Sequence, residues 1–391
     1  MVVYRVQQNF FSKIIIAILL LLSVLSIAKG CMNAMKYPGG NFDFHYPAFT
    51  SMASRVNPYG EEVSILHHEL GLDIRYTASY GPTNQLPSAI LLLTPLAFLK
   101  PSAADLLWCI CNVLFSAGIA ILIKSLFIDK FYTGTNKIFI ALIFAAVLFM
   151  GTPLRNSIGN GQNNIISVFF FLLSLWLSEK DHRILAGISL SATLFKYTLT
   201  VPLYLYYIYK KKYKEIITAA CVNILLTLAA AVWLGVSPVE MVIMSLHVSS
   251  KLSAQGMYDI CSLLGIQGIS VSVMLFLLTA AFVYYCSIKI PGHDGEIISM
   301  LVLFSLIFVY HRIYEYFVLI IPFAVIMTSH KYSLPEKIIT CLCIAYIFFF
   351  QRITLSLCSE SINLILHYSF AVMFYLMFFC MIYRLAKNIQ L

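Results

Sequence analysis

Long apolar stretches, separated by short clusters of lysine and arginine, run through almost the whole chain of 391 residues. Many of them approach the roughly 20 residues that an α-helix needs to cross a bilayer. They do not alternate between apolar and polar positions as the strands of a transmembrane barrel do, so helices must satisfy the backbone in lipid. The pattern predicts an all-α membrane protein with about twelve transmembrane helices.

The lysine and arginine clusters give these helices a direction, because cytoplasmic loops collect positive charge. We expect both termini inside and a long external first loop at about 30–100. Residues 1–29 are either an uncleaved first span or a signal peptide, and we favour the span. Single spans are expected near 11–29, 102–125, 137–152, 163–178, 213–234, 268–288, 296–310, 313–329, 338–354 and 361–383, with Leu154–Asn164 and a loop of about 235–267 outside.

The stretch 184–209 does not fit one crossing, because cytoplasmic-type charges flank both of its ends. Two short helices that meet near Lys196 and Pro202 resolve the conflict. Such a re-entrant hairpin is tolerated only beside a cavity, and it would place Lys196 toward the external side. Residues 87–99 are too few to cross comfortably, so we expect an interfacial helix there.

Composition agrees with this picture: 60% of the residues are hydrophobic, 11% are charged and the mean hydropathy is +0.87. These values exclude a soluble core for most of the chain and predict one polytopic membrane domain over 1–391. The net charge of +9 lies in short blocks that orient helices, so no nucleic-acid partner is expected. A disulfide among Cys31, Cys261 and Cys358 is left open.

Polar residues that are far apart in the sequence fall on the external side of this topology. They are Asp43, His45, Arg155, Gln162, Asn163, Asn164, Lys196, His311 and Arg312. The cationic members can donate to a phosphate held at the membrane surface, and Asp43 can accept a proton from a hydroxyl group. A base beside a phosphate clamp suits transfer of a group from a lipid phosphate to an alcohol.

Each of these residues also has a plainer interpretation. Asp43 could be a helix cap or a solvated surface residue. Lys196 could extend its stem to the membrane interface, and Arg312 could form an ordinary helix-end ion pair with Glu315.

Three motifs resemble the polyprenyl-phosphate-dependent glycosyltransferases of the GT-C fold, and within them glycosyltransferase family 87, which includes mannosyltransferases. The first joins Asp43-x-x-Tyr46 to Asn57-Pro58-Tyr59, and the second joins Arg155, Gly161-Gln162-x-Asn164 and Lys196-Tyr197. The third is His311-Arg312-x-Tyr314-Glu315 ahead of Pro322.

The resemblance implies an inverting transfer of a mannose-like or other sugar from a polyprenyl-phosphate donor to a glycolipid or glycan acceptor. It implies Asp43 as the catalytic base, with His45 and His311 in the catalytic site. Residues expected to bind the donor phosphate or sugar are Arg155, Gln162, Asn164, Lys196, Arg312 and Tyr314, and those expected to bind the acceptor are Tyr46, Asn57 and Tyr59. No cofactor is expected, and the carboxylates do not suggest a metal cage.

The chain departs from the family pattern at Arg55, where a small residue is usual, and near Gly81-Pro82, where a Pro-Pro pair is usual. Both departures concern the acceptor more than the reaction class. We expect a bacterial-type inner-membrane enzyme whose active site faces the periplasm. The alternatives are a secondary transporter or a lipid-linked-sugar flippase, for which we find no twofold repeat, and a structural membrane subunit.

Overall fold

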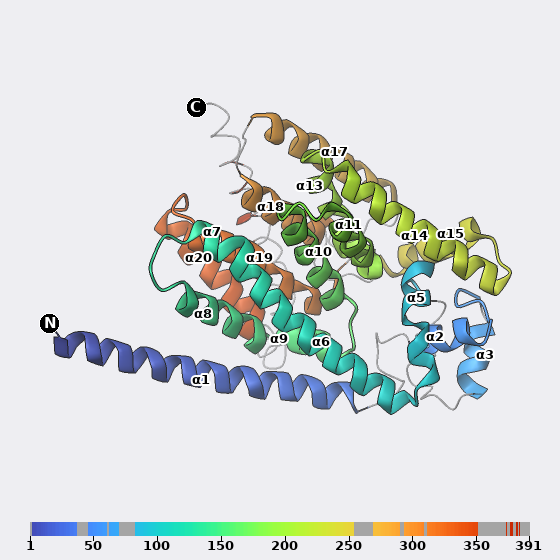
Figure 1. Ribbon diagram of the computed structural model, residues 1–391, viewed down its shortest axis with the longest axis horizontal. Helices are drawn as coiled ribbons and strands as arrows, with labels where there is room; N and C mark the ends of the chain where they lie inside the picture. Colours follow the sequence, from blue (N-terminus) through green and yellow to red (C-terminus); the bar gives the residue numbers. More distant parts are fainter. Residues whose placement is uncertain are drawn as a thin grey trace, which may run out of the picture.

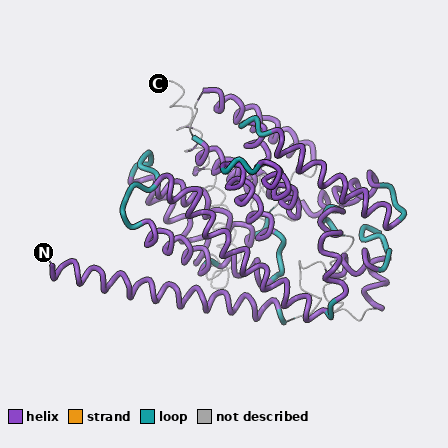
Figure 2. The backbone as a smooth tube through the Cα atoms, in the orientation of Figure 1, coloured by secondary structure: helices purple, strands orange, loops and turns teal. Residues whose placement is uncertain are grey.

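The computed structural model describes residues 2–36, 46–60, 62–69, 83–253, 269–289, 293–308, 311–350 and positions 373, 376, 377, 381 and 383. In this part of the chain Figure 2 shows helices and loops but no strand, which confirms the expected all-α class. The N-terminal half comprises α1 (Val2–Ala34), α2 (Tyr46–Ala53), α3 (Glu62–Glu69), α5 (Pro87–Leu93), η1 (Thr94–Phe98), α6 (Pro101–Ile123), η2 (Lys124–Ile128), α7 (Asp129–Phe131), α8 (Lys137–Met150), α9 (Thr152–Gly159) and α10 (Asn164–Glu179).

The second half continues the same pattern of long and broken helices (Figure 1). It comprises α11 (Arg183–Ala192), η3 (Thr193–Lys196), α12 (Tyr197–Thr200), η4 (Val201–Leu203), α13 (Tyr204–Tyr209), α14 (Tyr213–Leu234), α15 (Pro238–Ser253), α17 (Ile269–Lys289), α18 (Asp294–Phe308), η5 (Ile313–Leu319), α19 (Ile320–Thr328), α20 (Leu334–Ala345) and η6 (Tyr346–Phe350).

Four helical runs among the described residues are long and apolar enough to cross a membrane: Lys13–Ala34, Pro101–Phe131, Arg183–Tyr209 and Tyr213–Leu234. The pair α8 and α9, bent by 54°, would make a fifth. The protein is therefore a multi-pass membrane protein. The expected number of twelve is not reached in this part of the chain, because several apolar helices such as α10 are short and the expected span 361–383 lies almost wholly outside it.

The run Arg183–Tyr209 is continuous in helical conformation, yet its two ends lie together. Ser174 Oγ donates to the carbonyl of Ala186 over 2.7 Å and accepts from the hydroxyl of Tyr207 over 2.7 Å. A straight helix would hold positions 186 and 207 about 31 Å apart. The run folds back within η3, α12 and η4, so the expected hairpin around Lys196 is present.

Two expected loops have a different structure. Most of the described part of the segment 235–267 is the helix α15, whose Met241 is buried. The segment Leu154–Asn164 is not an exposed connection, because Leu154, Ile158 and Gln162 are almost fully buried. Within residues 87–99, α5 and η1 follow each other as one apolar helical segment, which is too short to count as a membrane span.

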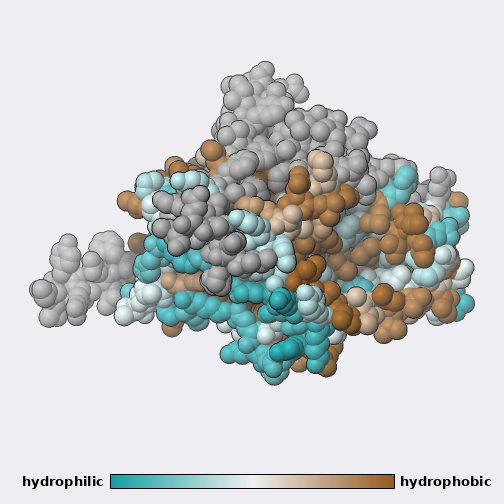
Figure 3. All heavy atoms as spheres, turned by 90° about the horizontal axis from the view of Figure 1, so that it is seen from above, coloured by the Kyte–Doolittle hydropathy of each residue, from teal (hydrophilic) through white to brown (hydrophobic). Residues whose placement is uncertain are grey.

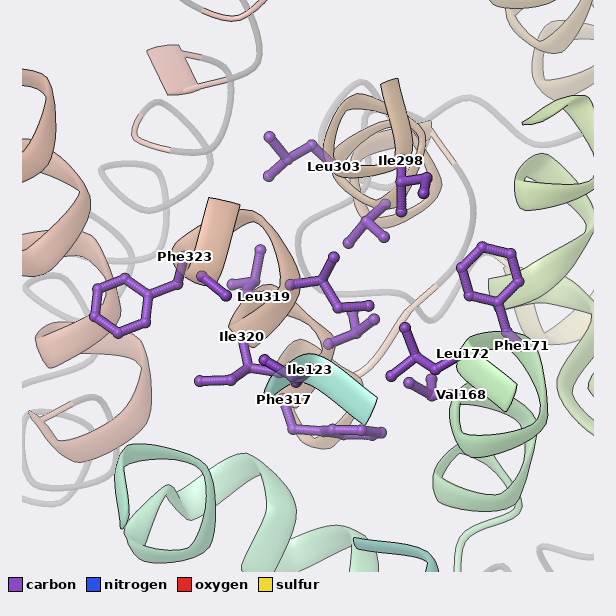
Figure 4. Packing of buried hydrophobic residues seen from close by; sticks show 14 of the residues in the cluster. Ile123, Val168, Phe171, Leu172, Ile298, Leu303, Phe317, Leu319, Ile320 and Phe323 are labelled. Atoms are coloured by element: carbon purple, nitrogen blue, oxygen red, sulfur yellow. The ribbon is translucent and has the colours of Figure 1, made fainter. Parts of the chain in front are cut away.

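Buried hydrophobic side chains form a cluster where the broken helices pack against one another. Figure 4 shows side chains of α6, α10, α18, η5 and α19 that belong to one buried cluster, among them Leu172, Leu303 and Phe317. Outside this core α1 exposes Leu21, Val24 and Leu25, and Figure 1 shows it along one edge of the molecule, as suits a helix that faces lipid. The core packs the turn of the hairpin against the start of η5, which creates the site described next.

Candidate active site

A buried carboxylate lies between two basic side chains at the turn of the hairpin. Glu315 Oε1 lies 2.8 Å from the ammonium of Lys196, and Glu315 Oε2 bonds to Nδ1 of His311. The side chains of Glu315 and His311 are 1% and 0% exposed, and that of Lys196 is 17% exposed. Such a carboxylate needs both partners, because an unpaired buried charge is costly.

The local backbone explains how these groups converge. Arg312 is extended, and η5 begins directly after it, so Glu315 turns back over the helix start. The backbone N–H of Arg312 donates to Glu315 Oε2 over 3.2 Å. The other partner, Lys196, ends η3, where the hairpin turns. We call Lys196, Glu315 and His311 the charged triad.

The second ring nitrogen of His311 also has a defined neighbour. Ser305 Oγ donates to the carbonyl of Leu199 over 2.9 Å and lies 3.2 Å from His311 Nε2. The ring of His311 therefore lies between Ser305 and Glu315, and it holds in place the carboxylate that pairs with Lys196.

A pocket opens beside the triad. Its lining comes from three separate parts of the chain, namely the loop before α5, the turn before α10 and the hairpin. The lining residues are Asn84, Gln85, Gln162, Asn163, Phe195, Lys196, Tyr197 and Thr198. Lys196 therefore both pairs with Glu315 and lines the pocket.

The turn before α10 is fixed from several sides. Gly161 has a positive φ of 65°, which favours glycine, and its carbonyl accepts from Trp108 Nε1 over 2.9 Å. Ser157 Oγ donates to the carbonyl of Tyr314 over 2.8 Å and accepts from Asn164 Nδ2 over 3.0 Å. These bonds attach the Gly161 turn to the segment that carries Glu315.

Three of the expected site residues, two for the donor and one catalytic, line the pocket or belong to the triad, and others support them. Gln162 and Lys196 line the pocket, and His311 belongs to the triad. Asn164 and the backbone of Tyr314 act through Ser157. Arg155 is not among the described lining residues, and its guanidinium donates to Thr152 over 3.3 Å.

The residues expected in the acceptor site are mostly buried. Tyr46 donates to the carbonyl of Leu99 over 2.8 Å, and Asn57 Oδ1 accepts from the backbone N–H of Tyr59 over 3.1 Å. Tyr59 donates to the carbonyl of Gln85 over 2.7 Å. Burial, and to a smaller extent Tyr197, raises the pKa of Tyr59 well above its usual value, so the phenol remains a donor. Asp43 and His45 lie outside the described residues.

The sequence did not identify Ser305 or Gln85 as site residues, and it gave Glu315 no role in the site beyond its place in the third motif and a possible ion pair with Arg312. Glu315 follows His311 by four positions, and this spacing was the available signal. Gln85 stands in a first loop with no periodic pattern, so only the folded chain shows that it reaches the hairpin. Among the described residues there is no group of three or more potential metal ligands.

Comparison with protein families gives one match for this chain. The model described as "Glycosyltransferase family 87" matches residues 87–310, more than half of the chain. Searches of curated proteins and of solved structures gave no match. The matched region contains the Gly161 turn, the hairpin and Ser305, whereas Asp43, His311 and Glu315 flank it.

Proposed function

The chain belongs to glycosyltransferase family 87, and from this we propose that it transfers a sugar from a polyprenyl-phosphate donor to a hydroxyl group of a glycolipid or glycan acceptor. The observation that carries the donor assignment is the position of Lys196, which pairs with the buried Glu315 and also lines the pocket. An ammonium at such a place can pair with the phosphate of the donor.

The proposed chemistry is a single displacement with inversion at the sugar. Asp43 removes the proton of the acceptor hydroxyl as its oxygen bonds to C1, and the bond from C1 to the phosphate oxygen breaks with its electron pair. The departing polyprenyl phosphate gains charge, which Lys196 stabilises, and Glu315 and His311 hold Lys196 in place and charged.

We place the reaction at the external or periplasmic face of an inner membrane. The hairpin enters and leaves at its lysine-rich ends, so Lys196 lies toward the opposite face. The first loop, which carries Asp43, approaches the pocket at Gln85.

The proposal is tested with purified protein, a radiolabelled polyprenyl-phosphate sugar and a mixture of acceptors. Asp43→Asn keeps the shape of the side chain and removes the base, so we expect transfer to fall by about 10²–10⁴-fold with unchanged insertion and thermal unfolding. His45→Ala should have a smaller effect, because its expected role is to orient Asp43 or the acceptor. Activity of Asp43→Asn within a few-fold of wild type would refute the base assignment, and a complete loss in His45→Ala would move that role to His45.

A further inference from the structure

Two connections at one end of the helix bundle repeat the same turn. Residues 180–182 join α10 to α11, and residues 210–212 join α13 to α14. In each turn the third residue donates its backbone N–H to the carbonyl five positions earlier, over 3.0 Å and 2.9 Å respectively. The second residue of each turn is left-handed, with a φ of 61° at Asp181 and 56° at Lys211. The chain therefore ends both helices with the same capping motif.

The two turns lie side by side. The hydroxyl of Ser178, at the end of α10, accepts from the ammonium of Lys212 over 2.8 Å and donates to Glu215 Oε1 over 2.6 Å. This bridge links the buried Glu215 to a cation. The helices α11 and α14, which begin at the two turns, are in contact along their length (Figure 1).

Three exposed lysines in and beside these turns are left over once the acidic residues are paired. They are Lys180, Lys211 and Lys214, which we call the lysine cluster. The neighbouring carboxylates already have basic partners; the pairs are Glu179 with Lys130, Asp181 with Arg183, and Asp294 with Lys210. Within the described part of the chain no carboxylate pairs with the lysine cluster. This end of the bundle therefore carries an excess of three positive charges.

Lys211 stands where a glycine is the usual residue. A left-handed backbone is strained for a residue with a side chain, and helices that end in this way mostly carry glycine there. The same chain uses Gly235, with a φ of 67°, at the corresponding end of α14. Strained residues often mark functional positions. The turn at 211 therefore holds a cation at a position where glycine would serve the fold better.

An exposed apolar surface continues from the lysine cluster. Ile184 and Ile188 on α11 are 55% and 46% exposed, and Ile217 on α14 is 61% exposed. All three lie in helical runs that are long and apolar enough to cross a membrane. Because both helices leave the turns in the same direction, these side chains extend from the lysines toward the interior of the bilayer. A cationic end on an apolar face is complementary to a phospholipid with a negative headgroup.

We propose that the lysine cluster binds the headgroup phosphate of an anionic phospholipid, whose acyl chains lie along the exposed face of α11 and α14. Lysine binds phosphate as a point charge, so three lysines from two turns can share one headgroup. The bound lipid bridges the two ends of the hairpin that carries Lys196, at the end away from that residue. The inference goes beyond the transfer reaction and does not depend on it.

The test measures lipid binding to the full-length protein in a non-ionic detergent by native mass spectrometry. The probes are phosphatidylglycerol and phosphatidylcholine with identical chains. Each lysine near an anionic headgroup contributes about fivefold, so we expect wild type to prefer phosphatidylglycerol by about 10- to 100-fold. Replacing the whole lysine cluster by glutamine should reduce this preference to within about threefold. Equal binding of the two lipids by wild type, or an unchanged preference in the triple variant, overturns the proposal.

The matched control is Lys337, another lysine without an acidic partner among the described residues, which lies in α20 and outside the two turns. Lys211→Gln should reduce the preference by about fivefold, and Lys337→Gln by less than about twofold. Equal losses in the two variants would show a general effect of charge and overturn the site. Displacement of phosphatidylglycerol by an equal concentration of glycerol 3-phosphate would replace the lipid by a soluble phosphate and overturn the lipid assignment.

Lys211→Gly separates binding from stability. Glycine relieves the left-handed strain, so in phosphatidylcholine alone we expect a thermal unfolding temperature at or above that of wild type. The same variant should bind phosphatidylglycerol about fivefold more weakly. Unchanged phosphatidylglycerol binding would overturn the role of Lys211 in the site.

Discussion

Lys196 is a charged residue that is mostly buried and lines the pocket. Its side chain is 17% exposed, and its ammonium lies 2.8 Å from Glu315 Oε1. The sequence predicted its importance because a charge inside an apolar stretch is expensive. It did not predict which group balances that charge, because Glu315 is 119 positions away and becomes a neighbour only when the hairpin meets η5.

Replacing Lys196 should affect the donor more than the acceptor. Lys196→Met preserves the apolar stem and removes the cation, so we expect the KM for the lipid donor to rise by about tenfold or more with little change in that for the acceptor. Lys196→Arg keeps the charge but not the compact geometry and should retain partial activity. Steady-state kinetics with each substrate varied in turn measures this, and equal effects on both substrates would contradict it.

Glu315 should couple energetically to Lys196. Glu315→Gln leaves a buried ammonium without its counter-ion, so we expect a loss of about 3 kcal/mol in the free energy of unfolding. Lys196→Met should destabilise through the unpaired carboxylate, and the double variant should be more stable than the sum of the two predicts. Denaturant unfolding in detergent gives the double-mutant cycle, and strict additivity would show that the pair does not interact. The exposed pair Arg183 and Asp181 is the control, because pairs in solvent couple weakly.

The hairpin formed by α11 to α13 shows how charge patterning can outweigh hydropathy at the scale of an element. Its apolar length alone suits a single span, and the lysines at both ends predicted the fold-back. The helix α15 was missed because Glu240, His247 and Lys251 interrupt its apolar pattern. That helix contacts the first loop through Ser245, which donates to the carbonyls of Asn84 and Gln85.

Close packing of the hairpin against α14 depends on Gly187. A Cβ built there would lie 2.5 Å from Thr218 Cβ and 2.7 Å from the carbonyl oxygen of Glu215. Alanine normally favours a helix over glycine by up to about 1 kcal/mol, but here the clash should reverse the sign, so we expect Gly187→Ala to destabilise by about 1–3 kcal/mol.

Thermal unfolding measures the effect of Gly187→Ala. The comparison variant is Gly118→Ala on α6, whose nearest neighbour is the edge of the Phe169 ring rather than backbone. A ring can rotate away, so this substitution should cost less. Stabilisation by Gly187→Ala would show that α11 and α14 are not packed as closely as the structure has them.

At the scale of the whole molecule, charged side chains gather into one connected belt. Lys130 pairs with Glu179, Ser178 bonds to both Lys212 and Glu215, Lys210 pairs with Asp294, and Lys331 pairs with Glu296. Near the other end of α14, Arg55 of the first loop lies 4.4 Å from the centre of the Trp233 ring. Figure 3 shows that hydrophilic residues gather on one part of the visible surface and apolar residues on another.

The belt predicts the orientation of the protein, because excess lysine marks the cytoplasmic side. In a variant without native cysteines, Cys at position 211 should react with a membrane-impermeant thiol reagent only after permeabilisation, and Cys at position 237, beyond the end of α14, should react from outside. Both positions are exposed and flank the same helix, so they serve as controls for each other.

Cysteine at position 196 then tests the depth of the site. Because the hairpin enters and leaves from the belt side, its turn should be reached from the external side only, and polyprenyl phosphate should protect it from the reagent. Labelling of position 196 from the cytoplasmic side alone would contradict the external site and the donor role of Lys196 together. Labelling from outside without protection would retain the topology and refute only the donor role, because accessibility follows from the fold-back whereas protection requires that the phosphate occupy the pocket.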